Sequence, residues 1–112
     1  MKYALLLYGS RTAVEDAPEP ERELDPGIAA VLAQPSVADW VRLHSIASAT
    51  TVRRQDGKRL LTDGPFLDSK EYIGGLVIVD AADLDGALAI AEELQEQRPN
   101  VVIEVRPVLE TA

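Results

Sequence analysis

The sequence predicts an α+β domain built on a split β-α-β plan with one extra β-hairpin. Apolar runs with the spacing of strands alternate with two stretches that carry the spacing of amphipathic helices. The order of elements is strand, helix, hairpin, strand, helix, strand, which is the split β-α-β order with a hairpin inserted. At 112 residues the chain suits one domain and is too short for two. We place a single domain at residues 1–108 and a C-terminal tail at residues 109–112.

The first elements are a buried strand, a polar loop and a short helix. Residues 2–8 are almost continuously apolar, which is typical of a central strand covered on both faces. Residues 10–23 are polar and acidic and contain two prolines, so we expect a loop, with a flap over a site as the alternative. Asp25 then occupies an N-cap position with Pro26 at the first helical position, and Pro35 ends the helix.

Residues 36–44 have the spacing of a second short stretch of helix, but their secondary structure stays open. Val37, Trp40, Val41 and His44 recur at i, i+3, i+4 and i+7 and would share one helical face. The only His of the chain would then lie beside its only Trp.

The centre of the chain is predicted to be a hairpin followed by a sharp turn. Residues 46–54 are rich in Thr and Val, as strands are, and residues 59–62 return antiparallel after the Asp56-Gly57 turn signal. Asp63-Gly64-Pro65 then bends the chain, because Gly accepts a positive φ and Pro keeps the residue before it out of the helical region. Phe66 follows the turn, where we expect its ring to anchor the loop to the core.

The last third of the chain is predicted to be strand, helix, strand. Residues 72–79 form the first of these strands, and their paired glycines, Gly74 and Gly75, indicate a bulge or a close approach of another backbone or a ligand. Asp80 or Asp83 caps the strongest helix of the chain, and residues 101–108 form the final strand. The apolar stripe of the helix is expected to comprise Leu84, Ala87, Leu88, Ala91 and Leu94.

This plan places both helices on one face of the sheet and leaves the other face open. Such a face carries more apolar surface than a monomer leaves in water. Pairing two sheets face to face would cover it, so we expect a two-fold symmetric homodimer.

Composition argues against several classes of protein. The absence of Cys excludes disulfides and thiolate catalysis, and with a single His we expect no metal site and no cofactor, haem at His44 included. A formal net charge of −8 argues against direct binding to nucleic acid. The chain has no apolar run of about 18 residues and no signal-peptide pattern. We therefore expect a soluble cytoplasmic protein that makes no contact with a membrane.

The candidate site is the set of polar side chains around the Asp-Gly-Pro turn. Arg53 and Asp63 lie on the two strands of one hairpin, and Lys70 and Glu71 follow the turn by a few residues. A buried Asp63 would act as general base while a nearby cation holds a small acidic substrate. The alternative is an ion pair that pins the loop. Further candidate residues are His44, Arg106 and, at the end of the first strand, Tyr8.

Several of these motifs together resemble one known family. They are Thr62-Asp63-Gly64-Pro65-Phe66, Lys70-Glu71, Gly74-Gly75 and Glu104-Val105-Arg106-Pro107, with Ala49 to Arg53 and Asp56-Gly57-Lys58 upstream. In these motifs the chain resembles the YCII-related, or DGPF-domain, family of small bacterial proteins over residues 1–9 and 43–108. The resemblance implies a ferredoxin-like α+β unit that pairs into a dimeric α+β barrel, in a family whose biochemical role is largely unassigned.

The resemblance also bears on site and partner. A His-Asp pair is regarded as an active site in the wider family, which Asp63 and His44 would match here. DGPF-domain proteins are often encoded beside, or fused to, sigma factors of the extracytoplasmic-function class, which implies a sigma factor as a partner. Three functions stay open: a small-molecule enzyme using acid-base chemistry, a non-catalytic ligand-binding or regulatory module, and a structural dimer whose barrel holds nothing. Whether the chain is an enzyme is left undecided.

Overall fold

The computed structural model describes residues 1–10, 24–67 and 69–111, and these residues form an α+β fold with antiparallel sheets. The predicted α+β class is thereby confirmed, while the loop predicted at residues 10–23, with a flap as the alternative, falls almost wholly outside the described residues. The elements in order are β1 (Lys2–Ser10), α1 (Pro26–Leu32), β2 (Val37–Arg42), a 3₁₀ turn η1 (Ile46–Ser48), β3 (Thr50–Gln55), β4 (Lys58–Asp63), β5 (Glu71–Asp80), α2 (Leu84–Gln97) and β6 (Val102–Pro107).

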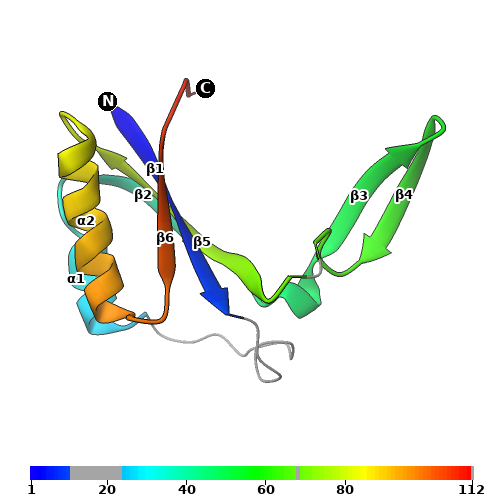
Figure 1. The fold of residues 1–112 in the computed structure, drawn as a ribbon, viewed down its shortest axis with the longest axis horizontal. Coiled ribbons are helices and arrows are strands. Elements are labelled where there is room, and N and C mark those ends of the chain that lie inside the picture. The colour runs from blue at the N-terminus through cyan, green and yellow to red at the C-terminus, as the bar shows by residue number, and fades with distance from the viewer. Residues whose placement is uncertain (11–23, 68, 112) are drawn as a thin grey trace.

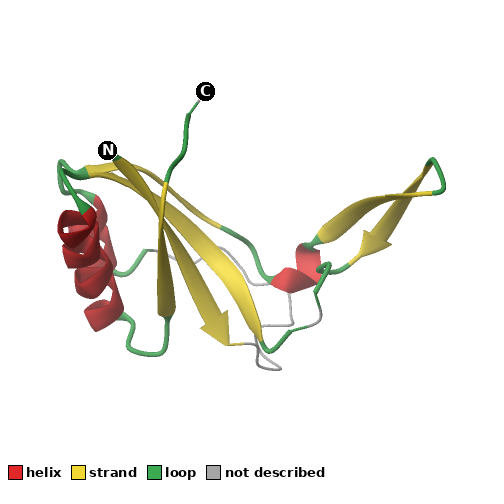
Figure 2. Cartoon of the chain, turned by 45° about the horizontal axis from the view of Figure 1, so that its top comes forward, coloured by secondary structure: helices red, strands yellow, loops and turns green. Residues whose placement is uncertain are grey.

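The main sheet has four antiparallel strands in the order β2-β5-β1-β6. With β3 and β4 set aside, this is a split β-α-β arrangement, compatible with a ferredoxin-like fold. Both helices lie on the same face of the sheet (Figure 1). Figure 2 shows the same two layers from another angle, with the far face of the sheet free of helix. None of the described helices is both long and apolar enough to cross a membrane.

The core lies between the sheet and the helices. Leu5 of β1 and Val79 of β5 are completely buried there, and Leu94 of α2 is almost so. The remaining core residues are Tyr3, Ile28, Val31, Leu32, Val77, Ala87, Ile90 and Ala91. The predicted stripe of α2 was therefore partly wrong, because Ile90 is in the core whereas Leu84 and Leu88 are exposed.

Side-chain caps fix where the helices begin. The Asp25 carboxylate accepts a hydrogen bond of 2.8 Å from the Gly27 N–H, and Pro26 is the first residue of α1, as predicted. Asp83 caps α2 by accepting from the Gly86 N–H at 3.1 Å. Asp80 instead lies 3.3 Å from the amino group of Met1.

Residues 37–42 form a strand, so the helix predicted within residues 36–44 was wrong. β2 pairs with β5 and carries a bulge between Val37 and Asp39. Val37 pairs with Val79, and Trp40 pairs with Val77. Since both of these valines are buried, the bulge places Val37 and Trp40 on the same face although they are three residues apart.

The face of the main sheet that no described helix covers is called the open face here. In β1 it carries Ala4, Leu6 and Tyr8, which alternate with the buried Tyr3 and Leu5. In β5 it carries Leu76 and Ile78, which alternate with Val77 and Val79. These five residues of the open face are only partly buried in the single chain.

Residues 50–63, which form β3, β4 and their turn, project from the domain as a separate two-stranded sheet that we call the arm. Its turn residues Asp56 and Gly57 have φ values of 51° and 76°, as a tight hairpin turn requires, so the predicted Asp-Gly turn is confirmed. The arm rises opposite the open face, which gives the molecule a U shape of 44 × 33 × 21 Å (Figure 1).

Candidate functional site

The Asp-Gly-Pro turn ties the end of the arm to its beginning. Gly64 has a φ of 103°, which favours glycine. Its N–H donates to the Ala49 carbonyl at 2.7 Å, and its own carbonyl accepts from the Thr51 hydroxyl at 2.7 Å. The predicted turn is therefore present, and it closes the base of the arm.

Asp63 itself is exposed at the end of β4, where it pairs in register with Thr50. Arg53 pairs with Leu60, and strand alternation directs it to the opposite face of the arm from Asp63. No described cation lies within salt-bridge distance of the Asp63 carboxylate. In the single chain Asp63 thus has neither the burial expected of a general base nor the ion pair offered as the alternative.

Phe66 does not anchor the turn to the core, because 68% of its surface is exposed. Its ring instead lies 5.6 Å from the Arg53 guanidinium, within the range of a cation–π contact. At an exposed site such a contact contributes about 0.5–1 kcal/mol. The contact orders the side chain of Arg53 without neutralising its charge.

His44 follows β2 and is exposed. In an extended chain, four residues span about 13 Å, so His44 and Trp40 are not the adjacent pair that a helix would have given. The structure brings His44 into no hydrogen bond or ion pair with any described residue.

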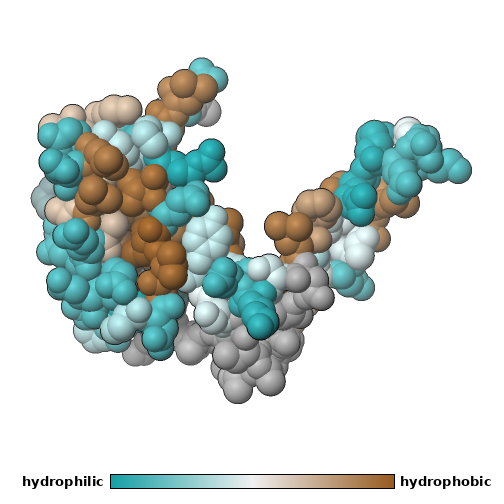
Figure 3. Space-filling view, viewed as in Figure 1, coloured by the Kyte–Doolittle hydropathy of each residue, from teal (hydrophilic) through white to brown (hydrophobic). Residues whose placement is uncertain are grey.

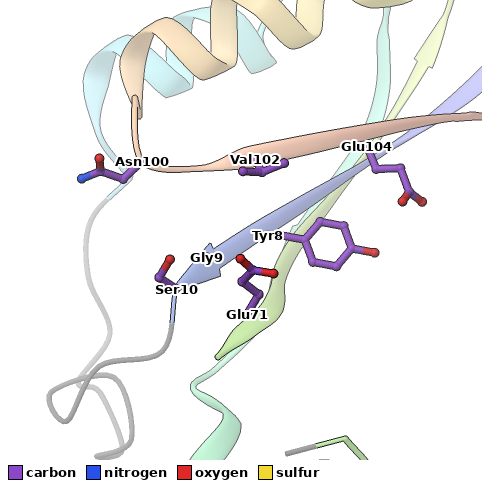
Figure 4. A pocket seen from close by; sticks show the side chains of 7 residues that line it. All are labelled: Tyr8, Gly9, Ser10, Glu71, Asn100, Val102 and Glu104. Atoms are coloured by element: carbon purple, nitrogen blue, oxygen red, sulfur yellow. The ribbon is translucent and has the colours of Figure 1, made fainter. Parts of the chain in front are cut away.

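A shallow depression of about 280 Å³ lies where β1 ends and where β5 and β6 begin. Two predicted site residues, Tyr8 and Glu71, line it together with Glu104. Figure 4 shows the Tyr8 ring between the Glu71 and Glu104 side chains. The remaining lining residues are Gly9, Ser10, Asn100 and Val102.

Strand register places these groups on the open face. Tyr8 pairs with Val102 and Leu6 pairs with Glu104, so Tyr8 and Glu104 lie on the same side of neighbouring strands. Ser10 pairs with Glu71 on the other flank of β1. The depression therefore lies at one end of the open face, next to the apolar residues that β1 and β5 place there.

The sequence was compared with models of known protein families and with curated proteins. The family model of the YCII-related domain matches residues 1–112, the whole chain. The chain belongs to the YCII-related family. An uncharacterized protein of Rhizobium meliloti (strain 1021) is 39% identical over 67 residues, which is 59% of this chain and 54% of that protein. The matched segment thus spans about half the length of this relative.

The depression of this YCII-related chain is rich in hydrogen-bond acceptors. Two carboxylates and a phenol would hold a ligand that is cationic or that offers several N–H or O–H donors. Among the residues that the structure describes, no Lys or Arg lines the depression, so an acidic ligand would need a cation from outside this lining. Neither Glu71 nor Glu104 forms a salt bridge with a described residue.

The other predicted site residues of the YCII-related chain lie outside this lining. Arg106 pairs with Ala4, one step further along the open face from Glu104, and Lys70 immediately precedes β5. Arg53 and Asp63 lie on the arm. The structure therefore divides the predicted set between the depression and the arm instead of gathering it in one pocket.

Glu104 was named from the sequence only within the Glu104-Val105-Arg106-Pro107 motif, and Asn100 was not singled out. Both lie in the depression because β6 is the neighbour of β1 in the sheet. The polar alternation of Glu104 with apolar Ile103 and Val105 was the available signal, but strand order was needed to place it beside Tyr8.

Proposed function

We propose that this YCII-related protein is a homodimer that binds a small molecule between two open sheet faces, at the depression formed by Tyr8, Glu71 and Glu104. The observation that carries the proposal is that apolar open-face residues lead into a polar depression where two carboxylates lie without a described cation. Face-to-face pairing would bury the apolar part and enclose the polar part. Polar groups that converge within apolar surroundings are typical of ligand sites.

Binding is the part of the proposal that the geometry supports best. Acid-base catalysis at Asp63 is a more specific proposal. It requires that dimer formation bury the Asp63 carboxylate, which is exposed in the single chain. A small acid stays a candidate ligand only if association also supplies a cation. The geometry of the single chain by itself favours a cationic or hydroxyl-rich ligand.

A partnership with a sigma factor is the second candidate function. The observation that favours it is the arm, whose exposed apolar side chains are suited to a protein partner. This candidate loses its supporting observation if a second copy of the chain covers the arm.

The dimer is tested by sedimentation equilibrium of the wild type and of Ile78→Glu. Ile78 lies on the open face, so a buried charge there should shift the protein to monomer at concentrations where the wild type is a dimer. Leu88→Glu is the matched control, because Leu88 is an exposed apolar residue on α2, on the other side of the molecule. A wild type that stays monomeric at every concentration would refute the dimer.

The ligand site is tested by thermal shift with panels of small amines, polyols and carboxylates. A ligand that binds only the folded state raises the midpoint of unfolding. We expect a compound that shifts the wild type to lose its effect on Glu104→Gln and to keep it on the control Glu110→Gln, which lies outside the depression. Equal shifts in both variants would place the ligand elsewhere.

A further inference from the structure

The arm has little support from its own chain. Its strands pair only with each other, and Val52 and Leu61 are 67% and 57% exposed although they are cross-strand partners. An isolated two-stranded hairpin is at best marginally stable in water. The bonds of Gly64 to Ala49 and Thr51 hold the base of the arm, but they cover none of its apolar surface. A surface from another molecule would complete the arm.

The charge of the arm indicates which surface of another molecule would cover it. Residues 50–63 contain four basic and two acidic side chains, a net charge of +2. Since the whole chain carries −8, the rest of the sequence carries −10. On the open face of a second copy, Glu71 and Glu104 are the acidic groups that a basic arm would meet. Opposite charges of this kind favour encounter and fix orientation.

The shape of the molecule indicates where the second copy would lie. Figure 3 shows a hollow between the open face and the arm, with apolar groups on both sides of it. In a two-fold symmetric dimer each copy offers the other the same surface, so an arm that reaches the partner is matched by the partner's arm in return. The hollow in each copy would then be filled by the open-face side of the other.

The depression contains carboxylates without described cations, and the arm contains cations without described carboxylates. Glu71 and Glu104 have no described cation within salt-bridge distance, and the arm carries Arg53, Arg54 and Arg59 with no described carboxylate partner. We propose that the arm of each copy lies across the open face of the second copy and brings its cations to the Glu71–Glu104 depression. This inference rests on the proposed homodimer and adds that the site is incomplete without the partner's arm.

A site composed of the depression and the partner's arm could bind an acidic ligand, which the depression of the single chain disfavours. With the partner's guanidinium groups at its rim, the depression would contain both anions and cations, and a small acid could be held by the arm while its hydroxyl or amino groups meet the carboxylates. Without the arm, the same depression would favour cationic ligands only.

Chemical cross-linking tests the arm directly, because the chain has no native Cys. Ser10→Cys lies in the depression and Gln55→Cys lies on the arm, and neither change removes a charge. The two single variants, one carrying a mass tag, are mixed and treated with a short bismaleimide. We expect a cross-linked product that contains one tagged and one untagged chain. Ser10→Cys mixed with Glu92→Cys, which is exposed on α2, is the matched control.

The possible results distinguish a failure of the arm inference from a failure of the homodimer proposal. If sedimentation shows a dimer but Ser10 and Gln55 cross-link no better than the control pair, the arm inference is wrong and the homodimer stands. If the mixed single variants give no product but a double variant, Ser10→Cys with Gln55→Cys, cross-links within its own chain, the arm folds back on its own sheet and the inference is again wrong. If there is no dimer at all, both proposals fail together and a different partner for the arm has to be sought.

Charge removal on the arm gives a second, independent measurement. Arg54 and Arg59 are cross-strand partners, so Arg54→Gln with Arg59→Gln removes two cations from one face of the arm and keeps its strand register. Arg98→Glu, at the end of α2, lowers the net charge by the same two units outside both the arm and the open face. We expect the arm variant to raise the dimer Kd by about tenfold or more and the control to change it far less. Equal effects of the two variants would mean that overall charge, not the arm, governs association.

Discussion

Gly74 and Gly75 are adjacent in β5 but meet different surroundings. The register of β5 with β1 passes from Gly75 to Ile73 between neighbouring residues of β1, so Gly74 is the extra residue of a bulge. A Cβ atom added to Gly75 would lie 3.1 Å from the Val41 carbonyl oxygen in β2. The two alternatives left open by the sequence, a bulge and a close backbone approach, are thus both present, one at each glycine.

These surroundings predict unequal effects of the same substitution. Gly75→Ala should lower the free energy of unfolding by about 1 kcal/mol, because the new methyl group pushes against the backbone of β2. Gly74→Ala should change it less, since the nearest atom to its Cβ is a Tyr72 ring carbon at 3.7 Å. Urea unfolding followed by circular dichroism measures both. A larger loss for Gly74→Ala would contradict this account of the β2–β5 contact.

Of the predicted site residues, Tyr8 and Glu71 line the depression, whereas Asp63, at the centre of the predicted set, does not. The Asp-Gly-Pro turn was correctly identified as a turn, yet its function in the single chain is to close the base of the arm through Gly64. A turn motif reports the backbone conformation that Gly and Pro impose. It does not report burial, which depends on what packs against it, and Asp63 is exposed.

At the scale of elements, β2 shows why a helix was predicted where a strand exists. Apolar residues in a regular strand recur every two residues, and a bulge inserts one more. The bulge at Ala38 brings Val37 and Trp40 to the same face at a spacing of three, which resembles the first step of a helical repeat. The pairing with β5 that decides between the two is not visible in a window of nine residues.

The apolar stripe of α2 gives a matched pair of substitutions. Leu94→Ala should lower the free energy of unfolding by about 3 kcal/mol, because Leu94 is 1% exposed and leaves a cavity. Leu88→Ala, on the same helix but 36% exposed, should cost less than about 1 kcal/mol. Denaturant unfolding of the two variants provides the comparison. Similar losses would mean that Leu88 is buried in the protein in solution, for example against a partner.

At the scale of the whole molecule, the order of elements was enough to predict an α+β domain with both helices on one face of a sheet, but not that β2 is the fourth strand of that sheet. Apolar periodicity locates helices and strands, and the split β-α-β plan then leaves few ways to connect them. The position of the arm did not follow, because its residues make contacts mainly with each other. The contacts of an exposed arm depend on the surface that packs against it, which neither the sequence pattern nor the single chain defines.

The uneven distribution of charge predicts how salt affects the dimer. Attraction between a basic arm and an acidic body is screened by salt, with a Debye length of about 10 Å at 0.1 M. The dimer Kd should therefore rise as NaCl is added, and it should rise less steeply for Arg54→Gln with Arg59→Gln. Sedimentation at several NaCl concentrations measures the slope. A wild-type Kd that is constant or falls with salt would indicate that apolar contacts alone hold the dimer.

β1 lies in the middle of the sheet, between β5 and β6. Both of its neighbours are translated long after it, since β5 begins at Glu71 and β6 ends at Pro107. During synthesis the apolar residues of β1 therefore stay unpaired until β5 and β6 have been made. The strands of the arm, in contrast, are neighbours in sequence and can pair as soon as both exist. A strand that is exposed for so long is the segment a chaperone would meet on the ribosome.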